Sequence, residues 1–345
     1  MNSLLHRLVY VTRMMSWLAD PRGLTRVPEY PIDRPIFLLG TQGGGLTLLS
    51  RMLRRHPQVI SVAGNCHYWT SADELQNVYG PVLPAELTGL RYKAPPHDQL
   101  PPPRSWTYAV GDLFQQYRRQ ANDATPRLAR ALQRVIRRAA QRHAIDPQQC
   151  RFLDKSQVFT VRVGLIHELL HESNPRFVLV PRDPYVSVLR AAEGKAADMR
   201  RLASKLSLAE RIRLCAEHYG NSMRAAIEDC DQLDCGLYLM PVEQLLLRPE
   251  QSLRKVCAFV GLDFHESMLP AAEHRLPLGS RFLDRWYPLR TDINEPYQQR
   301  LDDQTIDIVN HFCGDLIERL GYEKLGQGQL GPGRYAMASA ARQVA

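Results

Sequence analysis

Residues 35–49 read PIFLLGTQGGGLTLL, and this stretch decides how the chain folds. The apolar run at residues 36–39 is short and bounded, which is typical of a buried strand. After the glycines, apolar residues recur at the spacing of one helix face: Leu48, Leu49, Met52 and Leu53. The sequence therefore predicts a strand, a glycine turn and a helix. This arrangement directs free backbone N–H groups and the positive end of a helix dipole toward one point, where a phosphate or sulfate can bind.

The glycine turn matches only part of the phosphate-loop pattern G-x-x-x-x-G-K-[ST]. Gly40, Gly45 and Thr47 occupy their positions in this pattern, but Leu46 stands where the lysine belongs. An ordinary ATPase or GTPase is therefore disfavoured. A tight turn that binds no ligand would also explain three consecutive glycines. The rest of the chain has to decide between the two interpretations.

The composition is that of a globular protein with an anionic partner. The chain has 345 residues, of which 44% are hydrophobic, enough for one large α/β domain or two smaller ones. Its formal net charge is +8 and its pI is about 9.2. This charge favours a nucleotide, a sulfated or phosphorylated acceptor, a nucleic acid or an acidic membrane surface, without choosing among them.

The cysteines indicate a reducing compartment. There are seven of them, an odd number, and no two form a C-x-x-C pair. Reduced thiols are therefore expected rather than a disulfide framework or a zinc site, and the expected location is cytoplasmic. The apolar stretch at residues 4–18 is interrupted by His6, Arg7 and Arg13, and it is too short to span a bilayer. As an amphipathic helix it would dock on protein or lie on a membrane surface.

Strand and helix patterns alternate along the chain. Further strands are predicted at residues 59–62, 177–180 and 236–242. Further helices are predicted at residues 127–143, 161–170, 207–228, 249–259 and 302–320. This alternation indicates an α/β fold, a single three-layer domain with a mostly parallel central sheet and helices on both faces.

The predicted domain covers residues 31–325. An amphipathic extension at residues 1–30 precedes it, and a loose tail rich in glycine and alanine follows at residues 326–345. Residues 78–150 form a lid-like insertion, which begins with the proline-rich segment 78–105. The helix near the end of this insertion carries six arginines. These would either grip an anionic acceptor or form a solvated basic face.

Four stretches together resemble the sulfotransferases that use 3'-phosphoadenosine 5'-phosphosulfate (PAPS). The first is the glycine loop with RRHP at residues 54–57, and the second is a strand that runs into RDP at residues 182–184. The third is VEQL at residues 242–245, followed by FVGL at residues 259–262. The fourth is the lysine element DKSQ at residues 154–157. Their combination is much more specific than any one of them.

The resemblance implies which residues bind the donor. In the family the glycine loop holds the 5'-phosphosulfate, and the matching residues here are Gly43, Gly44, Gly45, Leu46 and Thr47. The arginine after the second motif's strand binds the 3'-phosphate, and Arg182 matches it. The family's serine eight residues later is replaced by Arg190, whose guanidinium can still bind a phosphate. The family's lysine helps to neutralise the bridging phosphate and corresponds to Lys155, which could otherwise be an ordinary surface lysine.

The chain departs from the family in its loop and in its proton acceptor. Many members have Arg-Ser-Gly-Thr-Thr where this chain has GGGLT, so backbone amides and Thr47 are left to hold the 5'-phosphate. In relatives, a glutamate or a histidine just after the second strand takes the proton of the acceptor hydroxyl. Asn65 stands at the glutamate position, and His67 is the nearest titratable group, with an ordinary pKa near 6.5 that suits proton abstraction. A packed, hydrogen-bonded core histidine would fit the sequence equally well.

Arg281 and Trp286 correspond to a loop of the family that closes over the nucleotide, although Trp286 could belong to the core.

The predicted function is transfer of a sulfuryl group from PAPS to a hydroxyl or amine, with Lys155 and His67 as the catalytic residues. The acceptor would be a carbohydrate, a lipid or a small molecule, and residues 1–20 could contact a membrane. No pattern of metal ligands or nucleic-acid-binding motif is visible. Two alternatives remain open. One is a nucleoside-triphosphate-dependent phosphotransferase, and the other is a nucleotide-binding protein whose catalysis has weakened.

Overall fold

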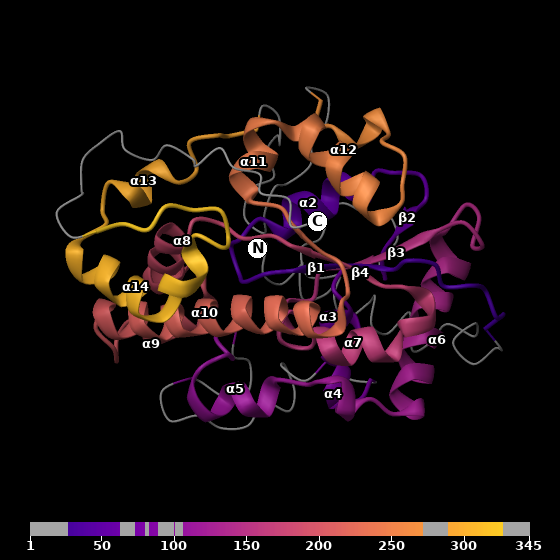
Figure 1. Ribbon diagram of the computed structural model, residues 1–345, viewed down its shortest axis with the longest axis horizontal. Coiled ribbons are helices and arrows are strands. Elements are labelled where there is room, and N and C mark those ends of the chain that lie inside the picture. The colour runs from indigo at the N-terminus through magenta and orange to yellow at the C-terminus, as the bar shows by residue number, and fades with distance from the viewer. Residues whose placement is uncertain are drawn as a thin grey trace, which may run out of the picture.

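The computed structural model describes residues 27–62, 73–79, 83–88, 100, 106–271 and 289–326. A parallel sheet forms its centre, and in this part of the chain the strand order is β2-β3-β1-β4-β5. The strands are β1 Ile36–Leu39, β2 Val59–Ile60, β3 Arg151–Asp154, β4 Arg176–Leu179 and β5 Leu237–Leu239. The central strand, β1, pairs with both β3 and β4. The chain folds as a single α/β domain with helices on both sides of this sheet (Figure 1).

Alternating side chains give the sheet two apolar faces. Along β1, Phe37 and Leu39 join the larger apolar cluster, whereas Ile36 and Leu38 join the smaller one on the opposite face. Phe37 also stacks against Phe177 of β4, with ring centroids 5.9 Å apart. A strand that is buried on both faces is apolar at every position. This is why the run at residues 36–39 could be predicted from the sequence.

Helices cover both faces of the sheet. The face with the smaller cluster is covered by α2 Leu46–Leu53, α11 Val242–Leu247 and α12 Pro249–Val260. The other face is covered by α6 Pro126–His143, α7 Val163–Leu169, α8 Pro184–Arg190, α10 Leu208–Leu233 and α14 Asp303–Ile317. In Figure 1, α11 and α12 lie above the strands and α10 and α7 below them. The three layers that the sequence predicts are therefore present.

Shorter helices connect these elements. They are α3 Leu75–Val78, α4 Ala85–Thr88, α5 Gly111–Tyr117, α9 Ala197–Leu202 and α13 Glu295–Gln298. Turns of 3-10 helix lie at Ala121–Asp123, Gln157–Val161, His171–Ser173 and Glu266–Met268, and a π-helical turn lies at Ala191–Lys195.

Local sequence explains where the long helices begin and end. Ser207 and Glu210 form a capping box at the start of α10, since each side chain accepts the other residue's backbone N–H. The side chain of Thr125 accepts the N–H of Leu128 at the start of α6. Gly261, with φ of 70°, ends α12 in the left-handed conformation that favours glycine.

The structure differs from the sequence predictions in a few elements. Strand β3 was not predicted, because its four residues carry charged Arg151 and Asp154 at their ends and show no apolar run. The strand predicted at residues 236–242 is shorter, and the helix predicted at residues 161–170 begins as a 3-10 turn that precedes α7. These differences leave the fold class unchanged.

Some predictions concern parts of the chain outside the described residues. These include nearly all of the extension at 1–30, most of the proline-rich segment 78–105 and the tail from residue 327 onward. The predicted domain boundaries therefore stay predictions. Within the described ranges, none of the helices combines the length and the apolar character that crossing a membrane requires.

A substitution at Gly45 tests how tightly the glycine turn is built. Gly45 has φ of 100°, and a Cβ there would collide with Cγ2 of Val242 on α11. Gly45→Ala is therefore expected to lower the free energy of unfolding by about 2–4 kcal/mol. Gly111→Ala is the matched control, because Gly111 also has positive φ, at 45°, but a Cβ there would meet no described atom within 4 Å.

Urea denaturation at one fixed pH measures both variants. The control is expected to lose only about 1 kcal/mol, from its backbone conformation alone. Equal losses in the two variants would show that Val242 does not restrict the turn.

Candidate functional site

The glycine turn leads from β1 into α2, and the neighbouring elements hold it in place. The N–H of Gly40 donates to Oγ1 of Thr160 at 2.8 Å, and this hydroxyl lies 3.1 Å from the carbonyl oxygen of Gly40. The N–H of Gly44 donates to the carbonyl of Thr41 at 3.2 Å. Among the described residues, no side chain caps the start of α2. The first N–H groups of a helix have no acceptor within the helix, so this end of α2 is suited to an anion.

Two arginines from the segment that follows β4 converge on the turn. Nη1 of Arg190, at the end of α8, donates to the carbonyl oxygen of Gly43 at 2.9 Å. Nη1 of Arg182, between β4 and α8, donates to the same oxygen at 3.4 Å. The structure thus brings together Gly43, Arg182 and Arg190, which the sequence prediction assigned to the donor. Burial and the neighbouring Arg190 lower the pKa of Arg182 to about 10, so it remains protonated at neutral pH.

Other contacts fix the orientation of Arg182. Its Nε donates to Oδ1 of Asn294 at 2.8 Å, and its Nη2 donates to the carbonyl of Ile293 at 2.7 Å. Oε1 of Glu243 accepts the side-chain amide of Asn294 at 2.7 Å and the backbone N–H of Asp183 at 3.0 Å. Glu243 therefore supports the arginine turn through two partners. The sequence contained this glutamate within the VEQL stretch, but nothing in the pattern revealed which residues it would join.

Asp183 begins α8 and is buried. Its Oδ1 accepts the backbone N–H groups of Tyr185 and Val186, at 2.9 and 3.2 Å, with Pro184 at the first helical position. Burial and the nearby carboxylate of Glu243 raise the pKa of Asp183 to about 7. Asp183 is thus a helix cap whose protonation changes near neutral pH.

On the other side of β1, Lys155 lies in a buried cluster of charges. Its Nζ is 2.6 Å from Oε1 of Glu74 and 3.3 Å from Oδ1 of Asp73. Nη2 of Arg54 is 2.9 Å from Oδ2 of Asp73. Burial alone would lower the pKa of Lys155, but the two carboxylates outweigh it and raise the pKa. The ammonium is therefore held in its charged form.

The sequence predictions did not include Asp73 and Glu74. Lys155 follows β3, whereas the two acids come directly before α3. Side chains of β3 connect the two segments, since Oδ2 of Asp154 accepts the N–H of Leu75 at 2.7 Å. Two adjacent acids before a short helix were the only available signal, and such pairs are common on protein surfaces.

The remaining predicted residues fall into two groups. Thr47 is half-buried on α2, and the side chain of Leu46 packs in the smaller apolar cluster, so only its backbone amide is available to a ligand. Asn65, His67, Arg281 and Trp286 lie outside the described residues. Their roles stay predictions.

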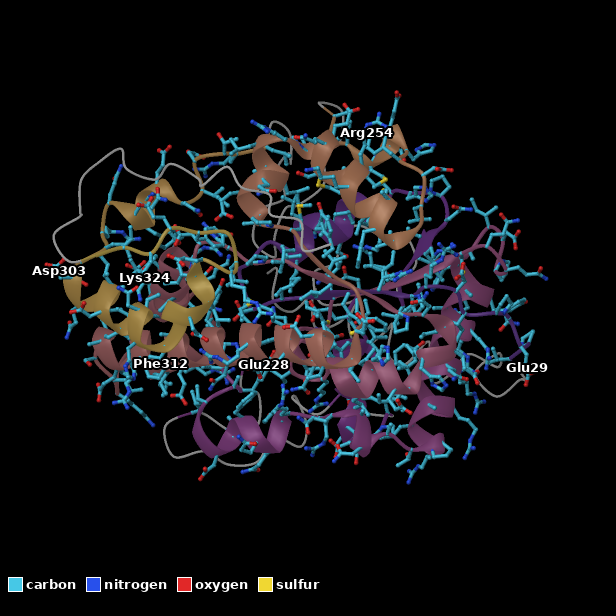
Figure 2. The ribbon with its side chains drawn as sticks, viewed as in Figure 1. Glu29, Glu228, Arg254, Asp303, Phe312 and Lys324 are labelled. Carbon is cyan, nitrogen blue, oxygen red and sulfur yellow. The ribbon has the colours of Figure 1, made fainter. Side chains whose placement is uncertain are left out.

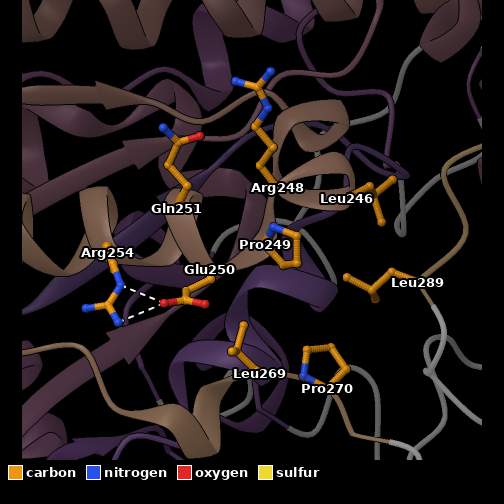
Figure 3. Close-up of a pocket in the computed structure, with 9 residues that line it drawn as sticks. All are labelled: Leu246, Arg248, Pro249, Glu250, Gln251, Arg254, Leu269, Pro270 and Leu289. Atoms are coloured by element: carbon orange, nitrogen blue, oxygen red, sulfur yellow. Dashed lines mark hydrogen bonds and ion pairs between the residues drawn. The ribbon is translucent and has the colours of Figure 1, made fainter.

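A cavity of about 680 Å³ lies elsewhere, beside α11 and α12 (Figure 3). It is lined by Leu246, Arg248, Pro249, Glu250, Gln251, Arg254, Leu269, Pro270 and Leu289. None of the predicted donor-binding or catalytic residues is among them. Within the described ranges, no three histidine, cysteine or acidic side chains gather as metal ligands.

The titration of Asp183 gives a testable pH dependence. Because its pKa is raised from 3.8 to about 7 in the folded state, the folded protein retains a proton that the unfolded chain releases. Its contribution to stability is complete below pH 4 and is lost as the pH rises to about 7. Relative to wild type, Asp183→Asn should therefore gain stability with rising pH over this range, by at most about 1.4 kcal/mol per pH unit.

Chemical denaturation at a series of pH values measures this difference. Asn also caps helices well, so the cap itself is conserved. Asp302→Asn, at the exposed start of α14, controls for the exchange of a capping carboxylate for an amide. A constant difference between Asp183→Asn and wild type from pH 4 to 8 would contradict the prediction.

Comparison with known proteins adds to this geometry. The sequence profile of the sulfotransferase family matches residues 35–266. No curated protein matches the sequence significantly. A solved structure with a similar fold is the sulfotransferase domain from the Synechococcus PCC 7002 olefin synthase, at 16% identity, with 84% of this chain and 98% of that chain covered and a TM-score of 0.41. The sulfotransferase domain from the curacin biosynthetic pathway is 15% identical, with 81% of this chain and 98% of that chain covered and a TM-score of 0.45. Sulfotransferase STF9 from Mycobacterium avium is 15% identical, with 74% of this chain and 70% of that chain covered and a TM-score of 0.45.

Proposed function

The chain belongs to the sulfotransferase family, and on this premise we propose that it transfers a sulfuryl group from PAPS to an acceptor hydroxyl or amine. The second product would be adenosine 3',5'-bisphosphate (PAP). The acceptor class is a carbohydrate, a lipid or a small molecule. We propose a cytoplasmic location, with peripheral membrane contact through residues 1–20.

The observation that carries the proposal is the convergence of Arg182 and Arg190 on the carbonyl of Gly43. Two guanidinium groups stand beside a helix end that no described side chain caps. The amides at the start of α2 suit the 5'-phosphate, and the arginines suit the 3'-phosphate. Two separate anionic groups on one nucleotide would match these two sets of donors.

The chemistry of this proposal needs little beyond positioning and charge. The bond between sulfur and the bridging oxygen of the 5'-phosphate breaks while the acceptor's oxygen or nitrogen bonds to sulfur, and the acceptor's proton passes to His67. Negative charge develops on the departing phosphate. The loop amides, the dipole of α2 and Lys155 would stabilise this charge more in the transition state than in the ground state. Lys155 suits this role because Asp73 and Glu74 keep it protonated.

Two alternatives make different predictions. A nucleoside-triphosphate-dependent phosphotransferase would need magnesium, and Leu46 leaves the glycine loop without the lysine that such enzymes use. A catalytically weakened nucleotide-binding protein would bind PAP without turning over PAPS, whatever residue stands at position 67. Asn65 and the altered loop motivate this second alternative.

Calorimetric titration with PAP, at low salt and without magnesium, tests the nucleotide site. Arg182→Ala is expected to weaken PAP binding by about tenfold or more, because a hydrogen-bonded charge pair contributes about 1.5–3 kcal/mol. The matched control is Arg254→Ala, since Arg254 pairs with Glu250 on the outer surface of α12 (Figure 2). Unchanged PAP affinity in Arg182→Ala would mean that the arginine turn does not bind the nucleotide.

Lys155 tests the catalytic part of the proposal. Lys155→Met is expected to lower the rate of PAP release from PAPS about tenfold or more, while PAP affinity changes little. The substitution also removes the ammonium from Asp73, which retains Arg54, and from Glu74, which retains two amide donors. Breaking such a buried ion pair costs about 3–5 kcal/mol of stability. The double variant Lys155→Met with Glu74→Gln removes one of these charges. If the double variant regains turnover together with stability, the role of Lys155 is structural.

A further inference from the structure

Arg51 is a buried cation with no hydrogen-bond partner among the described residues. It lies in the last turn of α2, and only 1% of its surface is exposed. Its Nε, Nη1 and Nη2 make no hydrogen bond to any described residue. A guanidinium carries five N–H donors, and burying them without acceptors is strongly destabilising. A side chain in this state requires an explanation.

The neighbouring carboxylates are already engaged by other groups. Asp73, whose charge acts on Arg51, lies between Arg54 and Lys155. Glu74 accepts from Lys155, from the amide of Gln76 at 3.0 Å and from the amide of Asn77.

Asp154, at the end of β3, accepts the backbone N–H groups of Leu75 and Ser156, each at 2.7 Å. The described carboxylates of the Lys155 cluster therefore support Lys155, Arg54 and the backbone, and none of them forms a hydrogen bond with Arg51. Burial lowers its pKa to about 10, which still leaves it charged at neutral pH.

The position of Arg51 places it beside the proposed donor site. Arg51 belongs to the helix whose first turn follows the glycine loop, and side chains on a helix lean toward its N-terminus. Its charged neighbours, Asp73 and Arg54, belong to the cluster that contains Lys155. Arg182 and Arg190 reach the loop from β4 and α8. Arg51 therefore lies on the opposite side of the loop from the residues proposed for the 3'-phosphate.

We propose that Arg51 binds oxygens of the sulfuryl group that is transferred. This inference rests on the proposed function and adds a residue to it. The 5'-phosphate occupies the start of α2, the 3'-phosphate lies toward Arg182, and the sulfuryl group extends toward Arg51 and Lys155. Planar guanidinium groups match tetrahedral oxyanions, which present two oxygens side by side. The sulfuryl oxygens supply the acceptors that the described protein groups do not.

Titration of PAP and PAPS in parallel tests the proposal, because the two ligands differ only in the sulfuryl group. Arg51→Met is expected to weaken PAPS binding about tenfold or more and to change PAP binding less than about twofold. Arg51→Lys, which retains the charge but not the fork, is expected to give an intermediate loss for PAPS. Arg254→Met removes an exposed charge of the same kind and should change neither affinity.

Thermal unfolding without ligand provides the second readout. Arg51→Met should raise the melting temperature, because it removes a buried charge that no described residue stabilises by a hydrogen bond. A lowered melting temperature with an unchanged ratio of PAPS to PAP affinity would overturn the proposal and make Arg51 a structural residue.

The test separates this inference from the proposed function. If wild-type protein binds neither PAP nor PAPS, the proposed function fails and the inference fails with it. If PAP binds and Arg51→Met leaves the preference for PAPS intact, only the inference fails. Should Arg51→Met not fold, Arg51→Lys decides the question by the same ratio.

Discussion

One backbone carbonyl holds the two halves of the candidate site together. The oxygen of Gly43 accepts hydrogen bonds from both Arg182 and Arg190, and it does so from a residue with φ of 89°. A side chain at this position would be strained, and its Cβ would lie 2.5 Å from Nη1 of Arg190. Glycine at this position therefore allows the close approach of Arg190. These hydrogen bonds connect the loop after β1 to the segment after β4.

Carboxylates position the cationic side chains on both sides of the candidate site. On the β4 side, Glu243 does not touch Arg182 through a hydrogen bond of its own but holds Asn294, which does. On the β3 side, Asp73 and Glu74 contact Lys155 directly. In the first arrangement an amide oxygen and a carbonyl, and no carboxylate among the described residues, accept hydrogen bonds from the guanidinium, which suits it to bind an anion. In the second arrangement the two carboxylates balance the positive charge of the ammonium. An anionic ligand at Lys155 therefore has to compete with them.

The parts of the site that could be predicted are local in sequence. The strand, glycine turn and helix lie within residues 35–53, and the arginine turn with its capping Asp183 follows directly from its strand. The contacts of Lys155 and Glu74 join residues 81 positions apart. Those of Arg182 and Asn294 join residues 112 apart. No periodicity encodes such pairs, because only the folded sheet brings them together. Strand β3 was missed for a related reason, since its burial comes from its neighbours and not from its own composition.

The order of the strands places the lysine cluster and the arginine pair on either side of one candidate site. Strands β3 and β4 both flank β1, so their backbones are about 10 Å apart at roughly 4.8 Å per strand spacing. Parallel strands end at the same edge, which places the lysine cluster and the arginine pair on opposite sides of the glycine loop. The two sides differ in kind, because one offers guanidinium groups that are fixed by amides and carbonyls, and the other offers a cation already paired with acids. A ligand with two unlike anionic ends would therefore bind in one orientation only. The order of the strands is sufficient to set that orientation.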